Sequence, residues 1–220
     1  QLMEDYLDDL TLDIWIYQPN ENIKKTIQQK ETKQKAKLTP ARALLLYSLY
    51  AYESAGEYSS LFAANKLAYF LQRMGQNMRL QFKRFHYGPY AIGVEKVLYH
   101  MNGVYLKGLE QGQAKPFEPL DLNYKKFEEV QQFIKTQLND EENQRLKQLI
   151  QFLNGFTSEL SLEILATVDY ILAENPGYDV DDIMEAINRW NPRKKELFKR
   201  SYVEIAYNHL QQYKESVFQS

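Results

Sequence analysis

The chain of 220 residues contains no cysteine, so it can form neither a disulfide nor a thiolate metal site. This composition fits a reducing compartment, and we expect the protein in the cytoplasm. No run of about 18 apolar residues occurs, so no membrane-spanning helix is predicted. Nothing after Gln1 resembles a signal peptide, and we interpret the chain as a piece of a longer protein.

Common catalytic motifs are also absent. The chain has no G-x-S-x-G, no P-loop and no H-E-x-x-H sequence. Its three histidines, His86, His100 and His209, lie far apart and do not have the spacing of metal ligands. We therefore predict no catalytic residue, no metal site and no cofactor, and we do not expect this chain to be an enzyme.

What the sequence does contain is a series of helical patterns. Hydrophobic residues make up 44% of the chain and charged residues 25%, as in ordinary globular proteins. Thr39-Pro40 predicts a helix start, because a hydroxyl side chain can cap the first turn and proline suits the first helical position. The helix that follows, 41–54, is apolar nearly all round and is predicted to be central and buried.

Further helices follow from the spacing of apolar residues. Gly75 is predicted to end the second helix, and Asn139 with Glu142 to form a capping box. The predicted helices after the first cover 62–74, Pro89 to Gly103, 130–138, 146–153, 160–171, Asp179 to Asn191, and 193–213.

One segment has the alternation of a strand. Residues 79–85 place Leu80 and Phe82 on one side and Gln81 and Lys83 on the other, which predicts a half-buried strand. Residues 104–106 could pair with it as a two-stranded wing. The predicted fold class is therefore mainly α, a multi-helix domain with one small winged-helix-like hairpin.

The chain is predicted to have three parts. Residues 1–19 hold a helix end and a strand over Thr11–Tyr17, which would need another sheet to join. Residues 20–38 are polar and are predicted to be a linker or a frayed helix. Residues 39–220 are the predicted helical domain, with a subdivision considered near residue 120.

The net charge of −2 hides an uneven distribution. Residues 39–115 carry nine Lys and Arg against four Asp and Glu, residues 116–185 carry five against fifteen, and residues 186–220 carry seven against three. One interpretation is ordinary variation among solvent-exposed helix faces. The other is that 116–185 form an acidic face for a basic partner, such as a protein whose usual ligand is DNA.

Several blocks occur in the order found in one known family. They are LTPARALLLY, KLAYFLQRMG, RLQF and YGPYA, with weaker matches in VLYHMNGVYLKG, PFEPLDL, LNGFTSELSLEILATVDYI and RWNPRKKELF. From about Leu38 to its end the chain resembles the C-terminal region of DarG proteins, bacterial antitoxins that neutralise a DNA ADP-ribosyltransferase toxin, DarT. It is also distantly similar to Panacea-type antitoxin domains. One departure is His86-Tyr87 before Gly88-Pro89, where the family leads us to expect smaller residues.

The resemblance implies a toxin-neutralising module that blocks the single-stranded DNA groove of the toxin by mimicking nucleic acid. It also implies that residues 1–19 are the last helix and strand of a macrodomain, whose ADP-ribosyl glycohydrolase site would lie upstream. The expected partner is the cognate toxin protein, and direct contact with nucleic acid or with a membrane is not expected.

The predicted toxin contacts are exposed acids and one aromatic residue, because carboxylates that stand where phosphates would lie could pair with Arg or Lys. These residues are Glu159, Glu163, Asp169, Tyr178, Asp179, Asp181 and Asp182. The last three also fit a purely structural role, since aspartate stabilises helix N-termini. The residues that mark the family are expected to shape the core and the turn; they are Lys66, Tyr69, Arg79, Tyr87, Gly88, Pro89 and Tyr90.

The alternative function is that of a winged-helix-like DNA-binding regulator. Arg79, Lys83 and Arg84 could contact phosphates, while Tyr87 and Tyr90 could stack on bases. The acidic downstream segment argues against this function, because it would repel a phosphate backbone unless it faced away.

Overall fold

Helices dominate the structure, as predicted. The computed structural model describes residues 36–109 and 115–218, so the expected macrodomain remnant (1–19) and nearly all of the expected linker (20–38) lie outside the described residues. Residues 35–220 form one compact unit, and the subdivision considered near residue 120 stays a prediction.

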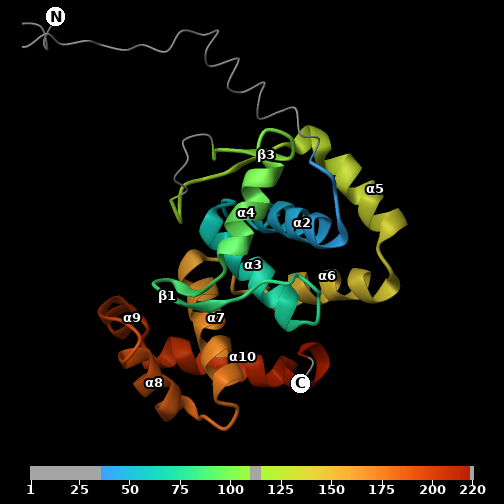
Figure 1. The fold of residues 1–220 in the computed structure, drawn as a ribbon. Coiled ribbons are helices and arrows are strands. Elements are labelled where there is room, and N and C mark those ends of the chain that lie inside the picture. Colours follow the sequence, from blue (N-terminus) through green and yellow to red (C-terminus); the bar gives the residue numbers. More distant parts are fainter. Residues whose placement is uncertain (1–35, 110–114, 219–220) are drawn as a thin grey trace, which may run out of the picture. The chain divides into compact units, whose positions relative to one another are not determined.

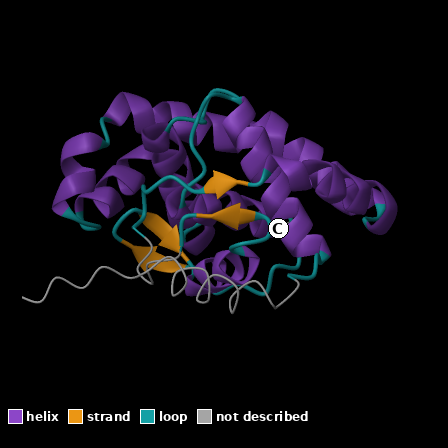
Figure 2. Cartoon of the chain, turned by 90° about the horizontal axis from the view of Figure 1, so that it is seen from above, coloured by secondary structure: helices purple, strands orange, loops and turns teal. Residues whose placement is uncertain are grey.

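Within the described residues there are nine α-helices and two antiparallel two-stranded sheets (Figures 1 and 2). In chain order the elements are α2 (Pro40–Ser54), α3 (Leu61–Arg73), β1 (Lys83–Phe85), β2 (Gly88–Tyr90), α4 (Ile92–Met101), β3 (Leu106–Lys107), β4 (Asp121–Leu122), α5 (Phe127–Gln137), α6 (Asp140–Phe152), α7 (Glu159–Glu174), α8 (Val180–Asn188), α9 (Pro192–Leu197) and α10 (Arg200–Val217).

Helices α2 and α3 form the centre of the core. The hydroxyl of Thr39 accepts a hydrogen bond from the backbone N–H of Arg42 at 3.4 Å, and Pro40 takes the first helical position, as predicted. Because α2 is apolar on nearly all sides, it is enclosed by α3, α5 and α6. Helix α3 is buried from Leu61 to Leu71 and contacts α2, α4, α6 and α7 (Figure 1).

Three predicted helix boundaries, one C-terminal and two N-terminal, are confirmed. Gly75 follows α3 with a φ of +89°, a conformation that suits glycine after a helix. Asn139 and Glu142 form a capping box at the start of α6. Asp179 caps α8, and Asp182 completes a second capping box there.

The predicted pairing of the small hairpin is wrong. Residues 79–85 and 104–106 do not pair as one wing. Instead, β1 pairs with β2 across a two-residue turn, and β3 pairs with β4 to make a second small sheet. Figure 2 shows these short strands among the helices.

Local backbone conformation explains the different hairpin. Arg79 adopts a left-handed φ of +54°, so the chain is not extended there. The backbone N–H and C=O of Leu80 bond to the side chain of Gln72, at 2.9 and 3.0 Å, rather than to a neighbouring strand. Gly88 has a φ of +97°, which lets the chain reverse directly before it.

Two predicted helices also have the wrong boundaries. Pro89 lies in β2, and α4 begins only at Ile92, because the backbone N–H of Ala91 donates to the side-chain oxygen of Asn65 and Ala91 stays extended. The helix predicted over 193–213 is divided into α9 and α10 at Phe198, whose side chain is buried. No glycine or proline marks this break in the sequence.

Candidate functional site

The β1–β2 hairpin is fixed to the turn between α8 and α9. Arg84 donates from Nη2 to the backbone oxygen of Arg189 at 2.5 Å, and its guanidinium lies 4.5 Å from the ring centroid of Trp190. Trp190 in turn donates from Nε1 to the backbone oxygen of Phe85 at 2.8 Å. Basic and aromatic residues about one hundred positions apart therefore share one surface, which we call the hairpin ridge: Lys83, Arg84, Phe85, Arg189 and Trp190.

A buried group of charges connects α7 to α9. The Glu163 carboxylate accepts hydrogen bonds from Arg193 Nη1 at 2.7 and 2.9 Å and from Lys194 Nζ at 2.5 Å. Lys194 also donates to the hydroxyl of Thr167 at 3.2 Å. The side chains of Glu163 and Lys194 are 2% and 0% exposed. Burial lowers the pKa of Lys194 to about 8, although the charge of Glu163 opposes this shift. We call Lys66, Glu163, Arg193 and Lys194 the Glu163 cluster.

Lys66 joins the hairpin to this cluster. Its ammonium donates to the backbone oxygen of Pro89 at 2.8 Å from inside the core. Burial, and then the charge of Lys194, lower the pKa of Lys66 to about 7. A Cβ atom at Gly88 would lie 2.9 Å from the hydroxyl of Thr167 and 3.4 Å from Lys66 Nζ. Because β2 packs directly onto α3 and α7, position 88 has little room for a side chain.

The tyrosines of the turn have internal partners. Tyr87 is half-buried, with its ring 4.7 Å from that of Phe117 and the guanidinium of Arg193 4.9 Å from its centroid. Tyr90 donates from its hydroxyl to Glu95 at 2.7 Å. Arg79, by contrast, is exposed.

Asp169 is the second buried carboxylate of α7. It accepts hydrogen bonds from the hydroxyl of Tyr69 at 2.6 Å and from Arg73 Nε and Nη2 at 2.7 and 3.1 Å. Burial, followed by the charge of Asp169, raises the pKa of Tyr69 well above its usual value. These bonds tie α3 to α7.

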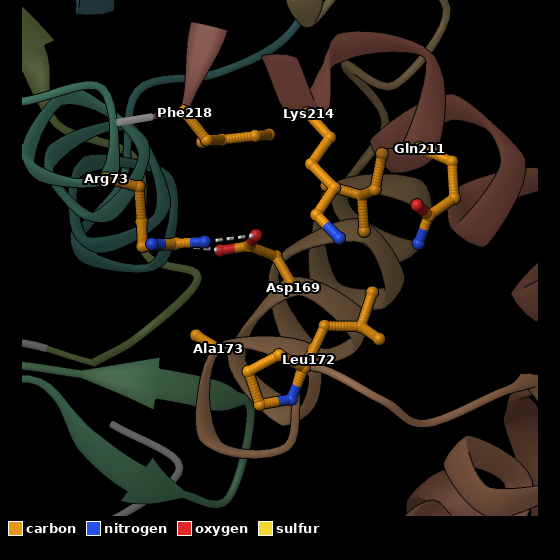
Figure 3. Close-up of a pocket in the computed structure, with 9 residues that line it drawn as sticks. Arg73, Asp169, Leu172, Ala173, Gln211, Lys214 and Phe218 are labelled. Atoms are coloured by element: carbon orange, nitrogen blue, oxygen red, sulfur yellow. Dashed lines mark hydrogen bonds and ion pairs between the residues drawn. The ribbon is translucent and has the colours of Figure 1, made fainter. Parts of the chain in front are cut away.

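An open pocket of about 340 Å³ lies beside the Arg73–Asp169 pair. Figure 3 shows the pair facing Lys214, which extends toward Asp169 from α10, and Gln211 of the same helix also lines the pocket. The remaining lining residues are apolar: Leu172, Ala173, Pro176, Leu210 and Phe218. The pocket is therefore an apolar hollow with charged groups at one side.

The predicted toxin contacts fall into two groups. Glu163 and Asp169 are buried and already bonded, so the expectation that they are exposed is wrong; both lie on the faces of α7 that pack against neighbouring elements. Tyr178 is half-buried against the core. The acids that are exposed are Glu159, Asp179, Asp181 and Asp182.

The exposed acids gather at the start of α8. Asp179 accepts from the backbone N–H of Asp182 at 3.0 Å, and Asp182 accepts from that of Asp179 at 3.1 Å. Asp181 forms an ion pair with Arg200, and its side chain is 75% exposed. Glu185, one turn further along, is 71% exposed and was not among the predicted contacts. We call Asp179, Asp181, Asp182 and Glu185 the α8 acidic face.

Glu159 stands apart from this face, at the start of α7. Partial desolvation, together with the nearby carboxylates of Glu57 and Glu163, raises its pKa. This carboxylate is therefore less readily ionised than an isolated glutamate.

The described residues show neither a metal-binding group nor a membrane-spanning helix. No group of three or more His, Cys, Asp or Glu side chains in the described ranges is placed to hold a metal ion. The two buried carboxylates of α7, Glu163 and Asp169, each accept three hydrogen bonds from internal donors. None of the helices in these ranges combines the length and hydrophobicity needed to cross a membrane.

Comparison with known proteins supplies the context for these surfaces. No protein-family model matches the chain. A DNA ADP-ribosyl glycohydrolase of Thermus aquaticus is 31% identical over 195 residues, which are 89% of this chain and 52% of that protein. Proteins of the same name from Mycobacterium tuberculosis and Mycobacterium bovis are each 23% identical over 144 residues, 64% of this chain and 41% of theirs. The chain is thus homologous to DarG-type DNA ADP-ribosyl glycohydrolases over most of its length, and it spans about half the length of the Thermus relative.

Proposed function

We propose that this chain is an antitoxin module, which binds a DarT-like DNA ADP-ribosyltransferase and inhibits it by occupying its DNA-binding groove. The observation that carries the proposal is the homology, which covers 89% of the chain. In this proposal the chain corresponds to the toxin-neutralising part of a DarG-like protein. The glycohydrolase activity named for the relatives would belong to the half that the chain does not span.

The α8 acidic face is the surface we assign to the toxin. Its helix buries Ile183 and Ile187 on the opposite side, so the acids face solvent. Arg and Lys side chains that line a nucleic-acid groove recognise phosphate oxygens, and carboxylates offer the same donors a negatively charged acceptor. Such mimicry needs several acids at short intervals, which the first turns of α8 provide.

The internal bonds of these acids leave them free to bind a partner. The capping bonds of Asp179 and Asp182 each use one carboxylate oxygen, and a carboxylate has two oxygens with about four acceptor positions. Asp181 is paired with Arg200 and Glu185 with Arg189, but all four side chains are more than half exposed. Exchanging such a pair for a partner's arginine costs little, because exposed ion pairs contribute only about 0–1 kcal/mol.

Co-purification and inhibition test the proposal. The chain is co-expressed with a DarT-like DNA ADP-ribosyltransferase, and modification of a single-stranded oligonucleotide by that enzyme is then measured. We expect a stable complex and loss of modification, with no affinity of the chain itself for the oligonucleotide. Separate elution of the two proteins together with full modification would refute the proposal.

A second candidate function rests on the hairpin ridge. Phe85 is 59% exposed and stacks on Tyr90 with ring centroids 5.1 Å apart, next to Lys83 and Arg84. Exposed aromatic rings beside cations can stack bases and contact phosphates, as in a DNA-binding regulator. A gel shift with single- and double-stranded DNA separates this function from the first: retention that weakens with salt and is lost in Phe85→Ser would favour the regulator.

A further inference from the structure

The pocket beside Arg73 and Asp169 carries an excess of positive charge. Two of its lining residues are cationic, Arg73 and Lys214, and one is acidic, Asp169. The charge of Asp169 is already balanced, because its side chain is 4% exposed and both of its oxygens accept hydrogen bonds from Arg73. One positive charge is left for a ligand.

Arg73 and Lys214 both line the hollow. Among the described residues Lys214 has no ion-pair partner, and Figure 3 shows its ammonium directed toward Asp169. Arg73 binds Asp169 through Nε and Nη2, and its guanidinium lies 5.1 Å from the ring centroid of Phe218. The Arg73 side chain is 29% exposed, so a ligand can reach it. An anionic group in the pocket would therefore meet two donors from different helices.

The apolar residues that line the pocket favour a ligand with an apolar body. Leu172, Ala173 and Pro176 come from the end of α7 and the turn after it, and Leu210 and Phe218 from α10 and the residue that follows. The volume of about 340 Å³ lies near the lower end of the range for small-molecule sites. It suits a ligand the size of an aromatic amino acid rather than a nucleotide.

We propose that this pocket binds a carboxylate attached to an aromatic or branched aliphatic body. The source could be a free carboxylic acid or the C-terminal residue of a peptide. The carboxylate would lie between Arg73 and Lys214, and the apolar body against Leu172 and Leu210. This site is separate from the α8 acidic face and does not depend on the proposed antitoxin function.

Calorimetric titration of the 220-residue chain tests the assignment. The probes are 3-phenylpropionate and its neutral amide, and acetyl-Leu-Phe with a free or an amidated C-terminus. We expect each carboxylate to bind about tenfold tighter than its amide, because a hydrogen bond to a charged group is stronger than one to a neutral group. Tighter binding of the peptide than of 3-phenylpropionate assigns the site to peptide C-termini, and the reverse order assigns it to free acids.

Three variants make the result specific. Lys214→Gln should weaken the preference for the carboxylate and leave the affinity for the amide unchanged. Lys195→Gln, an exposed lysine of α9 without an ion pair among the described residues, should change neither. Ala173→Trp, at an exposed helix position, should fill the pocket and abolish binding of all probes. Equal binding of acids and amides, or an equal loss in Lys195→Gln, would overturn the proposal, as would no binding at millimolar concentration.

Discussion

Replacing Glu163 by glutamine tests the buried charge network that holds α7, α9 and the hairpin together. The substitution keeps the shape of the side chain but removes the negative charge that faces Arg193 and Lys194. Lys194 is fully buried and Lys66 is 2% exposed, so neither ammonium can turn to water without disturbing the fold.

The expected loss is large for a domain of this size. Removing one partner of a buried ion pair costs about 3–5 kcal/mol, because the other charge stays buried without compensation. A typical domain has a free energy of unfolding of about 5–15 kcal/mol. Glu163→Gln should therefore fold but unfold at a much lower urea concentration.

The loss should also depend on pH. Glu163 raises the pKa of both Lys194 and Lys66, which burial lowers to about 8 and about 7. At pH 9 both lysines are largely neutral in the folded protein, so the missing carboxylate matters less. The destabilisation should be smaller at pH 9 than at pH 6.5 by about 1 kcal/mol or more, since one pKa unit corresponds to about 1.4 kcal/mol.

Urea unfolding followed by far-UV circular dichroism at both pH values measures these quantities. The matched control is Glu204→Gln, which removes an ion pair with Arg200 between side chains that are 45% and 53% exposed. It should cost less than about 1 kcal/mol. A loss below about 1 kcal/mol for Glu163→Gln, or an equal loss at both pH values, would refute the reasoning.

Two further predictions concern the same network. Gly88→Ala should lower the free energy of unfolding by about 2–4 kcal/mol, because residue 88 has a left-handed φ and the new Cβ would contact Thr167. The control Gly177→Ala, at a position with open space around it, should change the free energy of unfolding little. Urea unfolding measures both variants. Wild-type stability should rise with pH above about 7, because the pKa of Lys66 lies below the 10.5 of an unfolded lysine, so the unfolded chain binds more protons in this window. Lys66→Met should flatten this rise between pH 7 and 8, where Lys194, with its higher pKa of about 8, contributes less. An unchanged pH profile would contradict the burial of a titrating Lys66.

Local signals explain why most of the helices could be predicted from the sequence. Each helix-terminal signal acts within one or two turns, so a short stretch of sequence is enough to predict its effect; the signals are Thr39-Pro40, Gly75 and the Asn139–Glu142 pair. The hairpin could not be placed in this way. Its start depends on the Gln72 side chain, which bonds to the Leu80 backbone, and its turn depends on the contact of Gly88 with α7.

The candidate site shows the same division. Charge counts indicated an acidic segment, and Asp179 was placed correctly as a helix cap. The counts could not separate exposed acids from buried ones. Glu163 and Asp169 are neutralised by Arg193 and Arg73, which lie 30 and 96 residues away, and no local pattern predicts such pairs.

Calorimetry with a DarT-like DNA ADP-ribosyltransferase tests the central claim most directly. The variant Asp181→Lys, Glu185→Lys reverses two charges of the α8 acidic face and leaves both capping residues intact. The control, Glu118→Lys, Asp121→Lys, reverses two exposed acids elsewhere in the acidic segment.

We predict that the first variant binds the enzyme at least about tenfold more weakly, and that the difference is larger at low salt, because exposed charges are screened as ionic strength rises. The control should bind within about twofold of the wild type. Unchanged affinity of the first variant at both low and high salt would contradict the assignment of the α8 acidic face to the toxin.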